Sequence, residues 1–262
     1  MKNSILLFIL IFCSIKTWAC SCIFENIAQE YMEADFVGIV SIKKTYNNKT
    51  VELAKDFQRS TYKADLAFEK IYKGNEFDVL NIYGKANVTD DEPLLFGGCD
   101  LYVEKGEKYL VILKKNQNNE YWASMCSRVI YLSSEQNPLS DESEKINSYS
   151  NLFSGIEKYK EQFSTLKFVN LYDKTLRLNH KTNKLESDFT KLKIGDPSDK
   201  IGFYKVILND KMKIDHIVPI KKVGTRDEEI EEIIMKNLSF PQYAHSKNKP
   251  EELLILLYFQ DF

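Results

Sequence analysis

The chain has 262 residues, of which 44% are hydrophobic and 13% aromatic, enough for the core of one or two domains. Its formal net charge of −2 excludes a strongly basic nucleic-acid-binding surface and a polybasic membrane patch. The pattern along the chain is more informative, and it starts with an export signal.

The first 19 residues have the features of a signal peptide. Lys2 supplies the positive charge, an apolar run follows at 5–15, and Thr-Trp-Ala at 17–19 has small residues at both ends, which suits signal peptidase. The apolar run is shorter than the roughly 20 residues that cross a bilayer, so we expect no membrane span. We predict a mature chain that begins at Cys20 and is secreted or periplasmic. A lipid-anchored protein on an outer surface, acylated at Cys20, is the alternative.

Four cysteines remain after the signal: Cys20, Cys22, Cys99 and Cys126. An even number in an exported protein predicts two disulfide bonds. A bond between Cys20 and Cys22 would strain so short a loop, which leaves two crossing patterns open. In either pattern, the new N-terminus is held against the folded body of the protein.

After a short predicted helix at 23–32, the pattern changes to β-strands. Five segments have apolar, β-branched or alternating residues: 36–42, 62–71, 79–83, 109–113 and 121–125. Strands of uneven length closed by disulfides predict a mainly β fold, a five-stranded Greek-key barrel such as an OB-fold, with a sandwich left open. A helix that begins after Pro138 and reaches Phe163 with one apolar face flanks this barrel.

The remainder of the chain is predicted to contain a connector and an α+β unit. Residues 166–200 are polar and mixed, with one or two weak strands. Residues 201–262 form a ββαβ unit that we expect to fold alone, with these elements: strands at 203–208 and 213–220, a helix at 226–238 and an apolar strand at 253–259. Thr225 and Glu228 have the spacing of a capping box at the helix start.

Several of these segments are similar, in their order, to the N-terminal domain of the tissue inhibitors of metalloproteinases. The resemblance is carried by Cys-Ser-Cys at 20–22, Ala-Asp-Phe-Val at 34–37, Phe-Glu-Lys-Ile-Tyr-Lys-Gly at 68–74, Cys99 before a strand, and Gly-Glu-Lys-Tyr-Leu at 106–110. It assigns residues 20–165 to a TIMP-like domain. It implies an OB-like, netrin-type barrel with the disulfides Cys20–Cys99 and Cys22–Cys126.

The resemblance also implies a function and a set of site residues. A metalloprotease keeps one zinc position open for water, and the free amine and carbonyl oxygen of Cys20 would chelate the zinc there. Ser21 would enter the pocket for the substrate side chain that follows the scissile bond. The other residues expected to contact the protease are Cys22, Phe96, Gly97 and Gly98. Near this position the family presents a contact strand of larger residues, whereas this chain has Phe96, Gly97 and Gly98.

The C-terminal unit, 201–262, resembles the C-terminal domain of TonB-type energy transducers. The similar segments are Lys-Val-Ile-Leu-Asn-Asp-Lys at 205–211, Asp-Glu-Glu-Ile at 227–230 and Phe-Pro at 240–241. The resemblance implies a module that pairs strands with another envelope protein. A stabilising appendage is the alternative.

No enzyme is predicted. The histidines, His180, His216 and His245, stand beside no second ligand at helical spacing, and no zinc-protease motif, nucleophile elbow or phosphate loop is present. We therefore expect no cofactor, and no metal other than the zinc of a bound protease. The predicted function is a secreted inhibitor of zinc metalloproteases. The alternative is a non-inhibitory cell-envelope interaction module or lipoprotein that docks through the barrel and the ββαβ unit.

Overall fold

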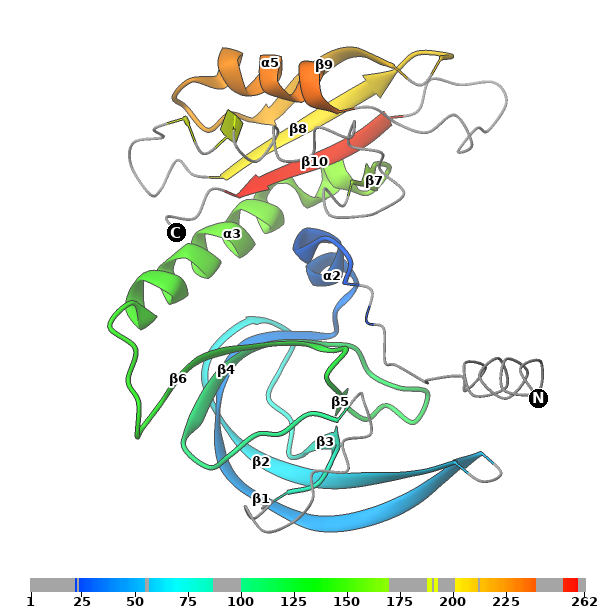
Figure 1. Ribbon diagram of the computed structural model, residues 1–262, viewed down its shortest axis with the longest axis vertical. Coiled ribbons are helices and arrows are strands. Elements are labelled where there is room, and N and C mark those ends of the chain that lie inside the picture. Colours follow the sequence, from blue (N-terminus) through cyan, green and yellow to red (C-terminus); the bar gives the residue numbers. More distant parts are fainter. Residues whose placement is uncertain are drawn as a thin grey trace, which may run out of the picture.

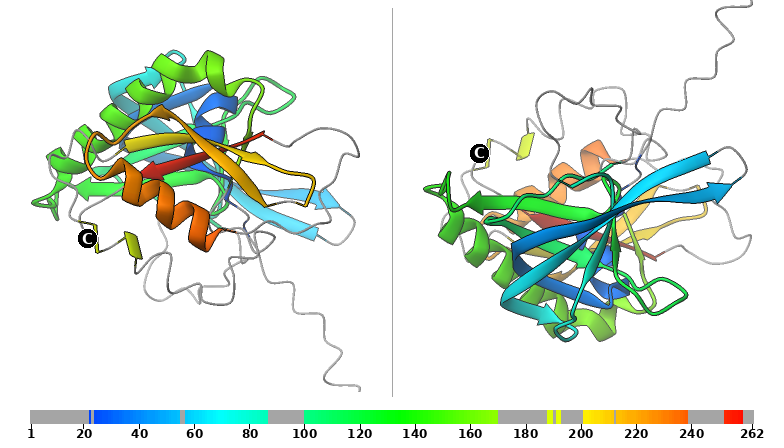
Figure 2. Two further views of the ribbon diagram at one scale, coloured as in Figure 1. Left: turned by 90° about the horizontal axis from the view of Figure 1, so that it is seen from above. Right: turned by 90° about the horizontal axis from the view of Figure 1, so that it is seen from below.

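The computed structural model describes residues 22, 24–54, 57–86, 100–169, 188–189, 191–192, 201–211, 213–238 and 252–258. Within them, two β-sheets lie on either side of two helices, α2 (Ile27–Glu33) and α3 (Glu142–Phe163) (Figure 1). Helix α5 (Asp227–Asn237) covers the far face of the second sheet (Figure 2). The fold is thus rich in β-sheet, a mainly β part followed by an α+β part. None of the described helices is both long enough and apolar enough to cross a bilayer.

The first sheet has six described strands in the order β5-β3-β2-β1-β4-β6. Their bounds are β1 Phe36–Ala54, β2 Phe57–Lys73, β3 Leu80–Tyr83, β4 Glu107–Leu113, β5 Trp122–Ala123 and β6 Arg128–Ser134. Neighbours are antiparallel except β3 and β5, which are parallel. The two ends of the order, β5 and β6, are separated in the chain only by residues 124–127. The sheet must therefore curl, and it forms a half-barrel (Figure 1).

The β1–β2 hairpin is longer than the sequence pattern predicts, and β6 is an additional strand. Strand β4 pairs with β1 only up to Ser41, and β3 pairs with β2 only from Thr61 onward. The rest of β1, residues 43–54, pairs only with β2 among the described strands, and together with residues 57–60 it forms a hairpin arm that extends beyond the half-barrel (Figure 2). The described hydrophobic clusters contain no β1 residue beyond Ile42, which is where the apolar pattern of the sequence ends.

The central strands of the half-barrel are buried on both faces. In β1, Val37 and Ile39 belong to the hydrophobic cluster that contains α2 and α3, whereas Phe36 and Val40 belong to the cluster inside the half-barrel. All four side chains are at most 1% exposed. Each such burial stabilises the fold by about 1.5–3 kcal/mol. A strand covered on both sides has no polar face, which explains the apolar run at 36–42.

The second sheet has the order β7-β10-β8-β9. Its strands are β7 (Lys167–Phe168), β8 (Ile201–Leu208), β9 (Ile214–Lys221) and β10 (Glu252–Tyr258). Elements β8, β9, α5 and β10 follow one another in the predicted ββαβ order. Strand β7 comes from the region expected to be a connector, and it pairs in parallel with β10 at Leu253 and Leu254.

Helix α5 begins differently from the prediction. Its N-cap is Arg226, which makes no side-chain capping bond, so the capping box of Thr225 and Glu228 is wrong. Asp227 instead fixes the loop ahead of the helix, because its carboxylate accepts the backbone N–H groups of residues 223 and 224 at 2.8 and 3.0 Å. A carboxylate in the first helical turn is also favoured by the helix dipole.

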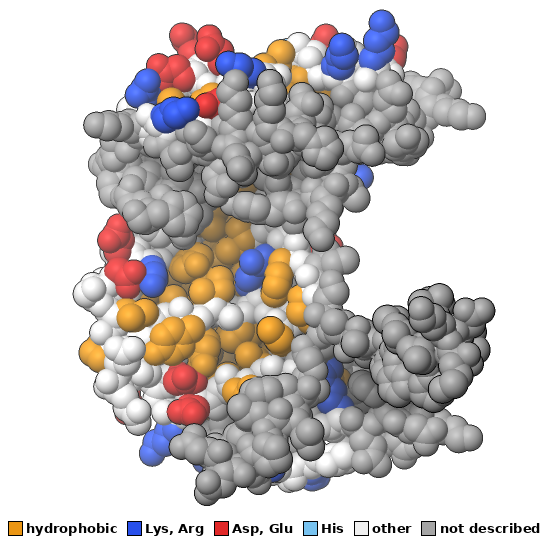
Figure 3. Space-filling view, viewed as in Figure 1, with side chains coloured by type: hydrophobic (Ala, Val, Ile, Leu, Met, Phe, Trp, Pro, Cys, Tyr) orange, Lys and Arg blue, Asp and Glu red, His pale blue; other side chains and the backbone are white. Residues whose placement is uncertain are grey.

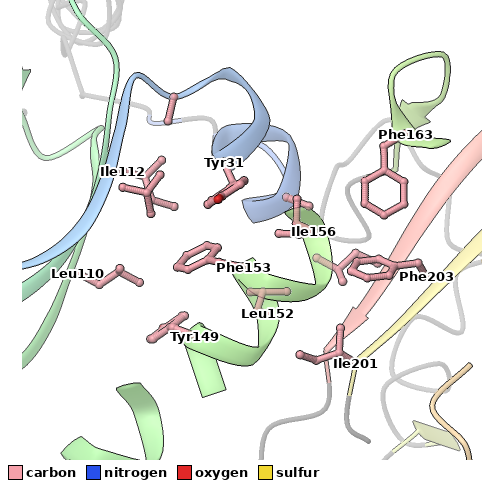
Figure 4. Packing of buried hydrophobic residues seen from close by; sticks show 14 of the residues in the cluster. Tyr31, Leu110, Ile112, Tyr149, Leu152, Phe153, Ile156, Phe163, Ile201 and Phe203 are labelled. Atoms are coloured by element: carbon pink, nitrogen blue, oxygen red, sulfur yellow. The ribbon is translucent and has the colours of Figure 1, made fainter. Parts of the chain in front are cut away.

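Helix α3 lies between the two sheets and joins their cores. Its buried side chains recur every three or four residues: Tyr149, Leu152, Phe153, Ile156 and Phe163. They form one cluster with Leu110 of β4 and with Ile201 and Phe203 of β8 (Figure 4). The space between the sheets is therefore a continuous hydrophobic core.

Candidate functional site

The candidate site is the N-terminal segment, residues 22 and 24–26, with the half-barrel residues that hold it. Of the residues predicted to act there, the following lie outside the described residues, and their roles stay predictions: Cys20, Ser21, Phe96, Gly97, Gly98 and Cys99. Cys22 and Cys126 are described. They form a disulfide bond with their Cα atoms 5.0 Å apart.

A tight turn between β5 and β6 presents Cys126. The Ser127 N–H donates to the Ser124 carbonyl at 2.9 Å, and the Cys126 N–H donates to the Ser124 hydroxyl at 3.1 Å. The Ser124 N–H donates in turn to the Ser127 hydroxyl at 3.0 Å. Three hydrogen bonds within four residues fix the half-barrel end of the disulfide.

Arg128, at the start of β6, makes a second attachment to the segment. Its Nη2 donates to the Glu25 carbonyl at 2.8 Å, and its Nε donates to the Glu30 carboxylate at 2.5 Å. The guanidinium also lies over the Phe24 ring, 4.9 Å from its centroid. The Arg128 and Glu30 side chains are only 22% and 14% exposed, so water screens this pair less than an ordinary surface pair.

Asn26 makes a third attachment by opening helix α2. Its side-chain oxygen accepts the Ala28 N–H at 2.9 Å, which satisfies one of the free N–H groups at the helix start. Ala28 is fully buried in the cluster between the sheets. The direction in which the chain enters α2 is therefore fixed.

The other end of α2 is held by Lys73 of β2 and by α3. The Lys73 ammonium donates to the carbonyls of Tyr31 and Met32, both at 2.9 Å, and burial lowers the pKa of this lysine. The Tyr31 hydroxyl donates to Glu157 of α3 at 2.9 Å. Burial and then this bond raise the pKa of Tyr31, so it stays a neutral donor. Helix α2 is thus a fixed platform for the segment.

Hydrophobic side chains are exposed next to the disulfide. Phe24 is 40% exposed and Met125 is 56% exposed, and each lies within two residues of a bonded cysteine. Figure 3 shows more hydrophobic side chains at the waist of the molecule, between the half-barrel and the second sheet. The site combines a fixed backbone with apolar surface, which suits contact with another protein.

The described part of the chain contains no group of three or more His, Cys, Asp or Glu side chains that come together. His216 is on β9, exposed, with its Nδ1 3.0 Å from the Asp215 carboxylate. His180 and His245 lie outside the described residues.

Sequence reasoning missed two of the residues that hold the segment. Asn26 carries a usable signal, because an asparagine just before a helical pattern is a common N-cap. Arg128 carries none, because its partners Glu25 and Glu30 are 103 and 98 residues away in the chain. No protein-family model matches this chain, and no curated protein matches it. The interpretation of the site thus depends on its geometry and on the resemblance in its sequence.

Proposed function

We propose that this protein is a secreted inhibitor of zinc metalloproteases in which the free N-terminal Cys20 chelates the catalytic zinc. One observation carries the proposal: the N-terminal segment, residues 22 and 24–26, is fixed at three points. Cys22 is bonded to Cys126, Arg128 binds the Glu25 carbonyl, and Asn26 caps α2. A terminus held in this way has little conformational entropy to lose when it binds.

The chemistry of the chelate is simple. The amine and carbonyl oxygen of one residue form a five-membered ring with a metal, and here they replace the water at the open zinc position. The amine binds in its neutral form, and its ordinary pKa of about 7.7–8 makes that form accessible near neutral pH. Ser21 then occupies the pocket for the residue after the scissile bond.

Other features of the molecule support the proposal. The consecutive strands β5 and β6 pair with different strands, β5 with β3 and β6 with β4, so one stretch of chain connects the two ends of the curled sheet. This connection supports an OB-like, TIMP-like barrel for residues 20–165. The Cys22–Cys126 bond fits a secreted or periplasmic location. Phe24 and Met125 offer apolar contact area beside the Cys22–Cys126 bond, in addition to the contacts proposed for Phe96, Gly97 and Gly98.

The decisive test moves the amine without touching the fold. One alanine added ahead of Cys20 removes the five-membered ring and places a methyl group at the metal. We expect the mature protein to inhibit at least one secreted zinc protease in a panel, and the extended form to lose that inhibition with an unchanged melting temperature. Equal inhibition by both forms, or inhibition by neither, contradicts the proposal.

A second function, a strand-pairing envelope interaction module, is favoured by one observation. Strand β9 is at the edge of the second sheet and pairs only with β8 among the described strands. Val218 on this strand is 39% exposed. An edge of this kind accepts an added strand from a partner. This reading becomes the better one if neither form of the protein inhibits a protease.

A further inference from the structure

The N-terminal segment is attached to the second sheet as well as to the half-barrel. The Asn26 side-chain amide donates to the Val169 carbonyl at 3.4 Å, and the Val169 N–H donates to the Leu254 carbonyl of β10 at 2.8 Å. Val169 is only 4% exposed, so its backbone bonds are shielded from water. One side chain therefore both opens α2 and connects it to the edge of the second sheet.

Side-chain packing through α3 also connects α2 to the second sheet. Tyr31 of α2 stacks on Phe153 of α3 with ring centroids 4.9 Å apart. Further along α3, Phe163 packs against Phe203 of β8, also at 4.9 Å (Figure 4). All four side chains are at most 2% exposed and belong to one cluster. Close-packed interiors transmit small displacements, so the second sheet and α2 are mechanically coupled.

We propose that the second sheet braces the N-terminal segment, with Asn26 as the positioning residue between them. The half-barrel holds this segment through Cys22 and Arg128, and the sheet sets its angle through Asn26. The consequence for protease binding rests on the proposed function: the sheet helps to fix the backbone of the N-terminal segment, and the residues proposed to contact the protease and its zinc, Cys20 and Ser21, directly precede it in the chain. Residues of the C-terminal unit then affect affinity without touching the protease.

The two roles of Asn26 can be separated by substitution in the full mature chain. Asn26→Asp retains the oxygen that caps α2, because Asp caps helices as well as Asn does, but it has no donor for Val169. Asn26→Ser is an uncharged cap that controls for repulsion between the carboxylate and the Val169 carbonyl, and its shorter side chain withdraws the hydroxyl donor from Val169. Glu232→Gln, at an exposed position on α5 of the same C-terminal unit, is the control.

Two measurements are made on each variant. The first is the set of backbone amide order parameters of Phe24 and Glu25 from NMR relaxation. We expect both Asn26 variants to lower them from the rigid range near 0.85, with a melting temperature lowered by no more than about 2–4 °C. The second is the inhibition constant, which should rise about two- to tenfold, as loss of one hydrogen bond implies. Glu232→Gln should change neither quantity.

The outcomes separate this proposal from the proposed function. Unchanged order parameters in both Asn26 variants overturn the brace, whatever the inhibition does. Lower order parameters with native inhibition overturn the role of Asn26 in positioning Cys20. If the native protein inhibits no protease, the proposed function fails, and the brace is decided by the order parameters alone.

Discussion

The half-barrel and the second sheet fill their cores in different ways. The half-barrel encloses a cluster of its own, in which Phe36, Tyr62 and Ile82 are at most 1% exposed. The second sheet has its own cluster only on the face that carries α5. On the other face, Ile201, Phe203, Leu254 and Leu256 belong to the cluster of α3 and α2. A unit that looks separate in the sequence thus depends on a helix that lies before it in the chain.

Among the changes that test this difference, removal of α3 should have the largest effect on the stability of the second sheet. The packing predicts that a fragment of residues 201–262 will not unfold cooperatively, because four apolar side chains on one face lose their cover. A fragment of residues 138–262 retains α3 and should be the more ordered of the two. Amide spectra and thermal unfolding of both fragments provide the measurement. Cooperative unfolding of the shorter fragment would instead support the independent unit expected from the sequence.

A single substitution at the shared face should have the next largest effect. Phe203 is fully buried and packs on Phe163 and Tyr159. Phe203→Ala should lower the free energy of unfolding by about 3–5 kcal/mol, and both sheets should still unfold in one transition. Urea unfolding followed by two probes, one in each sheet, measures this. Val218→Ala is the control and should stay within about 0.5 kcal/mol. Two separate transitions would show that the cores are not coupled.

The smallest effect concerns the ion pairs that join α3 to the half-barrel. Lys108 of β4 binds Glu142 at 2.6 Å and Glu69 at 2.8 Å. The hydrogen bond from Lys108, and then one involving Ser133, hold the pKa of Glu142 below its usual value. A lowered folded-state pKa contributes stability above the unfolded-state pKa, and this contribution disappears as the pH falls through the folded-state pKa.

Glu142→Gln should therefore destabilise the protein at pH 7, by no more than about 1 kcal/mol for a partly exposed pair. The difference from the native protein should shrink as the pH falls below the ordinary glutamate pKa of about 4.3 and on through the lower folded-state pKa of Glu142. Urea unfolding at pH 7 and at pH 3 measures both values. A difference that is the same at the two pH values would rule out the ion pair as its source.

The two regions also differ in how much the sequence predicts. Local patterns predict the apolar strand at 36–42 and the ββαβ order, because the period of hydrophobic residues is set by local geometry. The half-barrel curl and β7 are long-range features. β7 has two residues, and its pairing with Leu253 and Leu254 joins positions far apart in the chain.

At the site, the sequence predicts the Cys22–Cys126 pair only through a family resemblance. Two cysteine patterns remain open on residues alone, and spacing does not choose between them. Arg128 has no local signal, because a single arginine in a strand has many possible partners. Buried polar contacts of this kind depend on which distant segments meet in the fold. No short stretch of the sequence shows which segments these are.

The hairpin arm has a consequence for self-association. Beyond Ile42, β1 pairs only with β2 among the described strands, so its outer edge offers backbone groups to which a strand of another molecule could bind. Lys43, Lys44 and Lys49 are exposed along this part of β1, and Lys44 also binds Asp65 of β2 at 3.2 Å. Two molecules that paired edge to edge would bring these lysines together and desolvate them. We therefore expect the lysines to oppose strand-by-strand growth into fibrils.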